Sequence, residues 1–496
     1  MTTNQTTGIG SALYVYSSIS AANAIDLRNN IFANNQTTNT RYAINSDAAK
    51  TVFSNIDYND YYSTGSLGYL GSARAPLANW QTATGKDLNS LNITPPFISS
   101  ADLHLTGCSL LESAATPIAG ITTDIDADLR SSTNPDIGAD ESKMYFTGAN
   151  LTTPTLWNVN NNWSSFNIPT SDKCVNIPSG KTAVVNITTA VAKKVTVDAG
   201  GYLTISPNQA LTVTDVFTNS NVPNLVAASS PKQYYVTIEN DGNLLQTNKV
   251  TNVGAIAARR EINIRDHNQY NYAVSPLLNT NLNTNIYEDQ TSHNLSNAPF
   301  TLYHNEATNK FYTSSGAYIA GRGLAVKEPA TGTGKINMLF TGVPVNGSVP
   351  YTLVNSTPLD AVHGYNLIGN PYPSNLDLIS FYNENNTTGK LDPTFYFWDS
   401  TANSQTSQAG SGYGGEAYAK FNVSTPPGVG TPTIATGDAG FAGTKSATRY
   451  VKVGQAFMAR TTAGSLAVSF ENTQRAGNSA TGFFGKGAQE AAPFDR

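Results

Sequence analysis

Three aspartates alternate along one short segment and could bind a cation. Asp124, Asp126 and Asp128 occupy every second position of the sequence TDIDAD. Carboxylates spaced in this way can ligate Ca²⁺ when they lie in a loop. An EF-hand loop starting at Asp124 would need glycine at its sixth position and glutamate at its twelfth, where this chain has leucine and proline. We therefore expect an irregular Ca²⁺ site or, alternatively, a polar turn in which Arg130 pairs with a neighbouring aspartate.

The sequence carries no strong signature of another catalytic or metal centre. Its five histidines are scattered, without an HExxH motif, and no GxSxG nucleophile elbow occurs. The glycine-rich runs GRG (residues 321–323) and GSGYGG (residues 410–415) lack the βαβ context of a phosphate-binding loop. Ca²⁺ is therefore the only cofactor that we expect, and we assign no catalytic residue.

Several aromatic side chains raise a carbohydrate-binding hypothesis, because flat rings stack on the faces of sugars. The candidates are Tyr61, Tyr62, Trp80, Trp157, Trp163 and the run from Phe395 to Trp398. The alternative interpretation is structural. Phe395 and Phe397 alternate with two other aromatic residues, as in a strand with one face in the core.

The composition indicates a polar, weakly charged protein. Charged residues make up 13% of the 496 residues, against ~25% in typical soluble domains, and the net charge is −5. No basic cluster exceeds Arg259-Arg260, so we expect no nucleic-acid partner. No stretch approaches the ~20 consecutive apolar residues of a membrane helix, so we expect no membrane insertion. Residues 1–20 lack a signal-peptide pattern, and we expect the chain to be a piece of a longer protein.

The two cysteines are too few for a disulfide framework. Cys108 and Cys174 form no C-x-x-C motif either. We expect them to be two small buried residues.

Short segments with period-two alternation predict an all-β protein. They include TAVVNITT, KKVTVDAGGYLTI, ALTVTDVF and LAVSFEN, and glycine, proline, asparagine or aspartate separates them. Residues 77–91 are the best helix candidate. We expect three domains, at residues 1–145, 146–228 and 229–490.

The first predicted domain has an asparagine-rich repeat. Ile31 and Ile56 lie in similar settings 25 positions apart, a spacing typical of solenoids. A parallel β-solenoid would explain it, because corner asparagines tolerate left-handed backbone and stack in ladders. After Asp60 the repeat fades, as expected at a terminal cap.

A family resemblance agrees with this interpretation. The order NNIF, SNIDYNDYY, LANWQTATGKDLNSL, PPFIS, TDIDADLR and NPDIGADE (Asn134–Glu141) resembles the C-terminal end of a right-handed parallel β-helix of secreted and surface-anchored bacterial proteins. Ala127 stands where the family has glycine. Many β-helices degrade polysaccharides with paired acids in an open groove. Here Asp57, Asp60 and Glu141 lie in the last coils and the cap rather than in such a groove.

The second and third domains carry their own resemblances. The run WNVNNNW (residues 157–163) and the strands after it resemble a small β-solenoid or sandwich module of Bacteroidota exoproteins. GYNLIGNPYPSNLD (Gly364–Asp377) reads as a rigid turn at the edge of a β-domain, a setting in which cis X-Pro bonds occur. With ARREINI, TFYFWDS and VGQAFMART, it resembles the β-sandwich-like region before the sorting domain of type 9 secretion cargo.

The resemblance implies an extracellular or outer-membrane-surface protein of a Bacteroidota-like bacterium. Its partners would be the type 9 translocon and the surface-attachment machinery, through a C-terminal signal missing here, together with glycans. Asp399-Ser400-Thr401 resembles an O-glycosylation acceptor of these bacteria, with Ser400 as the attachment point. We expect a non-enzymatic adhesin or structural stalk. The alternative is the C-terminal part of a polysaccharide-degrading β-helix enzyme.

Overall fold

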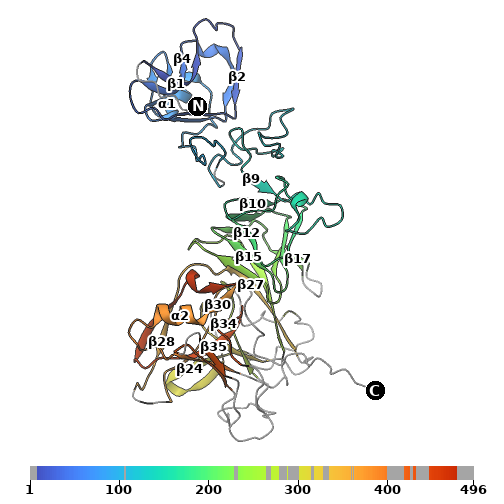
Figure 1. Ribbon diagram of the computed structural model, residues 1–496, viewed down its shortest axis with the longest axis vertical. Helices are drawn as coiled ribbons and strands as arrows, with labels where there is room; N and C mark the ends of the chain where they lie inside the picture. The colour runs from blue at the N-terminus through green and yellow to red at the C-terminus, as the bar shows by residue number, and fades with distance from the viewer. Residues whose placement is uncertain are drawn as a thin grey trace. The chain divides into compact units, whose positions relative to one another are not determined.

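The computed structural model describes residues 8–105, 108–227, 233–263, 270–278, 288, 301–313, 318–327, 335–358, 360, 362–398, 418–424, 428–431 and 446–477. The first unit comprises Met1–Asn150 and Val159–Asn176, and the second comprises Leu151–Asn158 and Ile177–Arg496 (Figure 1). Within the described residues strands predominate and two α-helices occur, so the predicted all-β class is confirmed. Neither of these helices is long and apolar enough to cross a bilayer.

Parallel strand pairs build the first part of the first unit. The strands are β1 (Gly10–Val15), β2 (Ile25–Arg28), β3 (Ile31–Asn34), β4 (Arg41–Ser46), β5 (Phe53–Asp57), β6 (Asp60–Ser63), β7 (Ser66–Leu70) and β8 (Ala73–Arg74), with a 3₁₀ turn, η1 (Lys50–Val52), before β5. β4 lies between β1 and β7, β5 pairs with β2, and β6 pairs with β3, all in parallel. Strands three apart in the chain are therefore neighbours, as in a coil with three strands per turn (Figure 1, blue). β8 ends the first sheet antiparallel to β7.

The repeat of this coil is longer than the predicted one. Ile31 pairs with Asp60 rather than standing one repeat before Ile56. The side-chain amide of Asn30 donates a 3.1 Å hydrogen bond to Oδ1 of Asn59, 29 residues further along the chain. Asn30 and Asn59 thus stack as one pair of the kind that an asparagine ladder would contain. The predicted spacing of 25 is wrong, because Ile31 in β3 pairs with Asp60 in β6, whereas Ile56 lies in β5 and pairs with Leu27.

A tryptophan closes the core of the coil. Trp80 lies in α1 (Leu77–Thr84), within the predicted helical segment, and is fully buried. A Cβ atom at Gly68 would come within 2.8 Å of the Trp80 ring, so β7 needs glycine where the indole packs. The indole Nε1 donates a 2.6 Å hydrogen bond to Oδ2 of Asp87, which also accepts a 2.7 Å bond from the Tyr61 hydroxyl. This network satisfies polar atoms that would otherwise be costly to bury.

The rest of the first unit contains little regular structure among its described residues. A separate apolar cluster includes Leu105, Leu111 and Ile137. β9 (Lys143–Tyr145) pairs in parallel with β10 (Cys174–Ile177), and η2 (Asn160–Asn162) lies between them in the chain.

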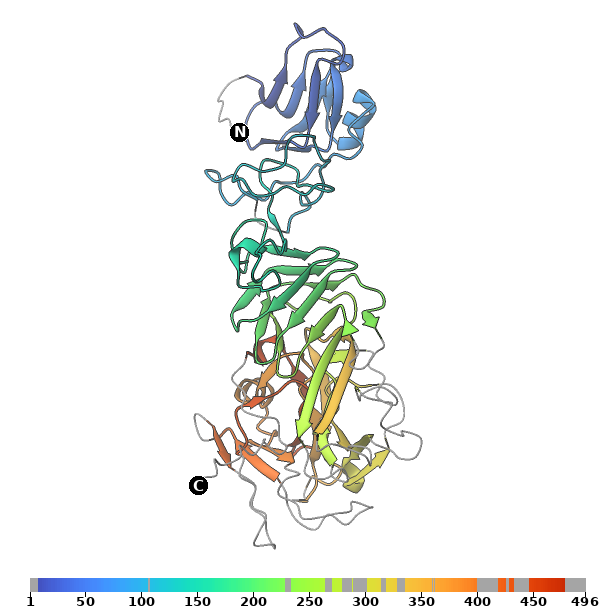
Figure 2. The same cartoon turned by 90° about the vertical axis from the view of Figure 1, so that its right-hand side faces the viewer.

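A second parallel stack opens the second unit. Its strands are β11 (Thr182–Val185), β12 (Ala190–Ala192), β13 (Lys194–Val197), β14 (Tyr202–Ile205), β15 (Ala210–Val213), β16 (Phe217–Asn219), β19 (Val236–Ile238), β20 (Asn243–Gln246) and β21 (Ile256–Asn263). Three sets of these strands pair in parallel: β11-β14-β19-β21, β12-β15-β20 and β13-β16 (Figure 2, green). This pairing runs past residue 228. The antiparallel strands β17 (Leu225–Ala227) and β18 (Gln233–Tyr234) lie between β16 and β19 in the chain.

Antiparallel sheets form the remainder of the second unit, beginning where β21 pairs with β27 (Lys335–Pro344). The other elements are β22 (Tyr270–Ala273), β23 (Leu277–Leu278), β24 (Thr301–Asn305), η4 (Glu306–Thr308), β25 (Lys310–Thr313), β26 (Leu324–Lys327), β28 (Val349–Val354), β29 (Tyr365–Gly369), β30 (Asn375–Asp377), α2 (Leu378–Asn385), β31 (Thr394–Trp398), β32 (Tyr418–Asn422), β33 (Val429–Thr431), β34 (Tyr450–Val451), β35 (Ala456–Arg460), β36 (Ser465–Phe470), η6 (Asn472–Gln474) and β37 (Arg475–Ala476).

The sheet β29-β35-β31-β32-β33 has an apolar core on each of its faces. Phe395 and Phe397 of β31 pack in one core with side chains of α2, β28 and β36. Tyr396 and Trp398 lie on the other face, in a core shared with β22 and β26. The predicted alternation is confirmed, and the second face is covered as well because a second antiparallel sheet packs on it.

The run Gly364–Asp377 forms a buried junction inside the second unit. After β29 ends, Oδ1 of Asn370 accepts a 3.1 Å hydrogen bond from the backbone N–H of Tyr372. The carbonyl of Pro373 accepts a 2.7 Å bond from the N–H of Leu244 in β20. The turn therefore ties the antiparallel sheets to β20, the last strand of the sheet β12-β15-β20 in the parallel stack.

The predicted setting of this turn is corrected in two respects. Among the described residues the cis peptide bond precedes Pro223, and those before Pro371 and Pro373 are not cis. Tyr372 is fully buried, so the turn lies in the interior rather than at an exposed edge. The turn is buried because its hydrogen bond to β20 holds it against that strand.

Candidate functional site

The predicted calcium segment forms a tight turn around one carboxylate. Oδ1 of Asp124 accepts hydrogen bonds from the backbone N–H groups of Asp126 (2.9 Å) and Asp128 (2.8 Å), and its Oδ2 accepts a 2.9 Å bond from the N–H of Glu141. Ala127 has a left-handed φ of 68°, the conformation that explains the glycine of the resembling family. The three aspartate side chains do not converge on one point as ligands, because Asp124 holds the turn together.

One aspartate of this turn joins a histidine that the sequence did not single out. Oδ2 of Asp126 lies 2.7 Å from Nε2 of His104, and the other ring nitrogen, Nδ1, lies 2.5 Å from Oδ1 of Asp102. Asp140 completes the group, because one ligand atom each from His104, Asp126 and Asp140 lie within 4.8 Å of one another. Oδ2 of Asp140 also accepts a 2.7 Å bond from the N–H of Leu105. We name His104, Asp126 and Asp140 the histidine cluster.

The carboxylates at and beside the histidine cluster outnumber the cationic side chains around them. Burial, and then repulsion from Asp124 and Asp126, raise the pKa of Asp128 to about 6. Hydrogen bonds to Asp102 and Asp126 raise the pKa of His104. The region therefore holds negative charge that a proton or a metal ion would balance.

A second group of carboxylates lies buried in the cap. Burial, and then repulsion from Asp136, raise the pKa of Glu141 to about 7, although Arg130 opposes the shift. Arg130 lies 3.7 Å from Glu141 and donates to the carbonyls of Gly138 and Asp136. The predicted pairing of Arg130 with a neighbouring aspartate is therefore wrong, because its guanidinium turns inward to the PDIGADE segment.

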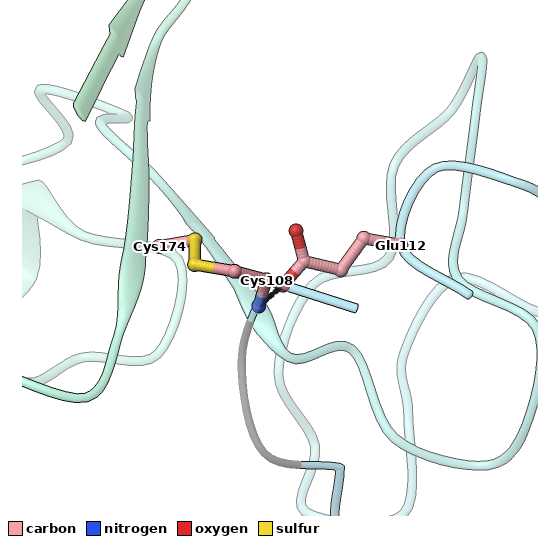
Figure 3. Close-up of side chains that lie close together, drawn as sticks. All are labelled: Cys108, Glu112 and Cys174. Atoms are coloured by element: carbon pink, nitrogen blue, oxygen red, sulfur yellow. Dashed lines mark hydrogen bonds between the residues drawn. A yellow bond between two sulfur atoms is a disulfide. The ribbon is translucent and has the colours of Figure 1, made fainter. Parts of the chain in front are cut away.

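The two cysteines form a disulfide, which corrects the prediction of two unpaired buried residues. Cys108 and Cys174 lie 66 positions apart, with Cα atoms 5.6 Å apart. The bridge fixes an irregular loop to the start of β10, and Figure 3 shows the Glu112 carboxylate beside it. That carboxylate accepts a hydrogen bond from the N–H of Cys108, and burial raises its pKa. Spacing alone could not reveal the pair, because nothing local brings the residues together.

The second unit contains a small pocket with a basic side chain. It has a volume of about 160 Å³ and is lined by residues that include His304, Arg322 and Tyr351. The guanidinium carbon of Arg322 lies 4.4 Å from the centre of the Tyr303 ring. No side-chain hydrogen bond or ion pair of Arg322 occurs among the described residues. Arg322 is the central residue of the GRG run.

Close packing fixes the position of Arg322. The N–H of Gly323 donates a 3.1 Å bond to the carbonyl of Leu367 in β29. A Cβ atom at Gly323 would lie 2.8 Å from the Leu367 side chain, so this approach requires glycine. Nδ1 of His304 is buried and has no hydrogen-bond partner among the residues that the structure describes, and burial lowers the pKa of this ring.

The other predicted site residues have different outcomes. Ser400 lies outside the described residues. Most of the proposed sugar-stacking rings are buried in cores and offer no face to a glycan: Tyr61, Trp80, Trp157, Trp163, Phe395, Phe397 and Trp398. Sequence reasoning missed His104 and Asp140, which no recognisable spacing connects to Asp126, and it missed Arg322.

Comparisons with known proteins add one finding. No curated protein and no solved structure matches the chain. A model of a family described as a domain of unknown function, DUF8693, matches residues 146–495. Because the match spans more than half of the sequence, the chain belongs to the DUF8693 family.

Proposed function

We propose that this chain is a secreted or surface-displayed, non-enzymatic stalk, exported by a type 9 secretion system. The observation that carries the proposal is the parallel pairing, in both units, of strands from successive turns of a coil. Stacked coils form elongated, repetitive surfaces that suit a spacer or an adhesive fibre. In this proposal both stacks are right-handed parallel β-helices, and the sheets around β31 form a β-sandwich.

The disulfide supports the extracellular part of the proposal. Bridges such as Cys108–Cys174 persist in oxidising compartments and are rare in reducing ones. The placement of the acids supports a non-enzymatic role. Asp136 and Glu141 are buried and satisfied by backbone N–H groups and Arg130, whereas glycoside hydrolysis needs two carboxyl groups open to substrate.

Location can be tested in the native host. Protease treatment of intact cells should degrade the protein, and loss of the type 9 translocon should leave it protected inside the envelope. Persistence of surface protein without the translocon would contradict the proposed route. Purified protein should show no turnover on pectins, alginates or glycosaminoglycans, and measurable depolymerisation would favour the enzyme alternative.

The pocket around Arg322 supports adhesion as a second candidate function. Among the described residues Arg322 forms no ion pair, and the carboxylate of Glu306, which also lines the pocket, accepts backbone N–H bonds from Ser356 and Gly364. The Arg322 guanidinium lies over the Tyr303 ring, an arrangement that suits a carboxylate-bearing sugar. A pocket of about 160 Å³ is below the ~300–1,000 Å³ of drug-sized sites, so it would admit a single small group.

A glycan array provides the test of adhesion. We expect binding to uronic-acid glycans but not to their neutral counterparts, with loss in Arg322→Gln. Lys310→Gln removes an exposed positive charge from β25 and should leave binding intact. Equal binding of acidic and neutral glycans would contradict the role of Arg322, and binding of acidic peptides alone would assign the pocket to a protein ligand.

A further inference from the structure

We propose that the histidine cluster, His104, Asp126 and Asp140, binds a transition-metal ion of the Zn²⁺ class. The three side chains come from three separate segments: the end of an irregular loop, the TDIDAD turn and the PDIGADE segment. One nitrogen and two carboxylate oxygens meet there, and both are ligand types that zinc takes.

The three ligand atoms lie within the range that one ion could bridge. Nε2 of His104 and Oδ2 of Asp126 lie 2.7 Å apart, and all three ligand atoms lie within 4.8 Å of one another. Zinc takes nitrogen and oxygen ligands at about 2.0–2.2 Å, so a tetrahedral ion would set them roughly 3.4 Å apart. In the proposed site the ion would replace the direct 2.7 Å contact between His104 and Asp126 and move these two ligand atoms apart. The side chains of His104 and Asp126 are 41% and 51% exposed, which leaves an entry path and room for a water ligand.

The second ring nitrogen of His104 gives independent support. Nδ1 lies 2.5 Å from Oδ1 of Asp102, and the same oxygen accepts a 3.1 Å bond from the backbone N–H of His104. A carboxylate that holds one ring nitrogen in this way fixes the tautomer and presents the other nitrogen to a metal. Asp102 is therefore a positioning residue. Nε2, held toward two carboxylates, has the orientation of a ligand.

The ligand types favour zinc over the calcium predicted from the sequence. Ca²⁺ takes six to eight oxygen ligands, whereas this cluster offers one nitrogen and two carboxylates. Asp124, which the calcium prediction required, already accepts three backbone N–H bonds. A bound ion would cross-link three segments that contain little regular secondary structure. Its role would therefore be structural.

Calorimetric titration of the tag-free, chelator-treated chain tests the proposal. We expect one Zn²⁺ per chain, weaker binding of Ca²⁺ and Mg²⁺, and a visible Co²⁺ spectrum of tetrahedral type. His104→Gln and Asp126→Asn should each lower Zn²⁺ affinity by at least about 10-fold, and Asp102→Asn by about 10–100-fold. These exposed positions should tolerate substitution, and far-UV circular dichroism checks the fold.

His363→Gln is the matched control, because His363 forms a similar pair with Asp360, 3.0 Å away in the second unit. It should bind Zn²⁺ like the parent chain. The proposal is overturned if the parent does not bind Zn²⁺, if it binds Ca²⁺ more tightly, or if folded His104→Gln keeps the parent affinity.

Discussion

The phenolic hydroxyl of Tyr372 donates a 2.6 Å hydrogen bond to the backbone carbonyl of Gly347. Both atoms are buried, and the guanidinium carbon of Arg475 lies 4.8 Å from the centre of the tyrosine ring. Nη2 of Arg475 donates a 2.6 Å bond to the carbonyl of Leu244 in β20. Tyr372 therefore stands at the point where the parallel stack and the antiparallel sheets of the second unit meet.

Tyr372→Phe should destabilise the second unit by about 1–3 kcal/mol, because it leaves a buried carbonyl without a donor. Differential scanning calorimetry would measure the loss. Tyr312→Phe is the control, since its hydroxyl bonds only to Thr308 at the surface, and it should cost less than about 0.5 kcal/mol. Equal effects of the two substitutions would show that the hydrogen bond to Gly347 contributes nothing specific.

The Cys108–Cys174 bridge should stabilise the first unit. A disulfide that closes a long loop typically contributes about 2–4 kcal/mol, so reductant should lower the melting temperature of this unit. The double variant Cys108→Ser/Cys174→Ser should melt at the reduced temperature and should not respond to reductant. Labelling of free thiols in the unreduced, folded parent would contradict the bridge.

Asp60 should make the first unit less stable as the pH rises. Burial raises the pKa of this carboxyl to about 6, and its Oδ2 has no hydrogen-bond partner within the described part of the chain. A folded-state pKa above the ordinary value of 3.8 means that stability is greatest below about pH 4 and declines as the pH rises through 6. Asp60→Asn should flatten this dependence, by about 1–3 kcal/mol between pH 4 and 7. Urea titrations at several pH values measure the slope, and an equally steep slope in folded Asp60→Asn would contradict the role of Asp60.

Local patterns predicted the elements of the fold better than their register. The alternation around Phe395 depends only on neighbouring residues, and the structure confirms it. The coil period depends on which residues of successive turns pair, and Ile31 pairs with Asp60 rather than standing one repeat before Ile56. Strand propensity and hydrophobic periodicity do not show which corner of one turn stacks on which corner of the next.

The candidate sites depended on contacts that no spacing encodes. Asp126 was recognisable from the alternating carboxylates, but His104 and Asp140 reach it from other segments. The bridge from Cys108 to Cys174 likewise depends on how an irregular loop folds onto β10. The histidine cluster and the disulfide form only when distant segments fold together. A single sequence does not reveal such contacts unless a motif marks the residues.

A buried ion cluster at the junction gives the opposite pH dependence to Asp60. Asp241 pairs with Arg260 and lies 2.9 Å from Nζ of Lys452, and both cationic side chains are buried. Burial alone would raise the pKa of Asp241, but the two cations outweigh it and lower that pKa. The resulting stability is present above about pH 4 and is lost as the pH falls through the folded-state pKa.

Asp241→Asn should therefore cost about 3–5 kcal/mol at pH 7, because it leaves Arg260 and Lys452 buried without their carboxylate. Asparagine tolerates the left-handed φ of 64° at this position, so the loss would come from the charge rather than the backbone. Calorimetry at pH 7 and pH 3 measures the free energy of unfolding, and the difference in stability between parent and variant should be smaller at pH 3. Asp215→Asn, in the same unit and with no ion pair among the described residues, should change neither value. A gap that stays constant with pH would show that the loss comes from packing and not from ionisation.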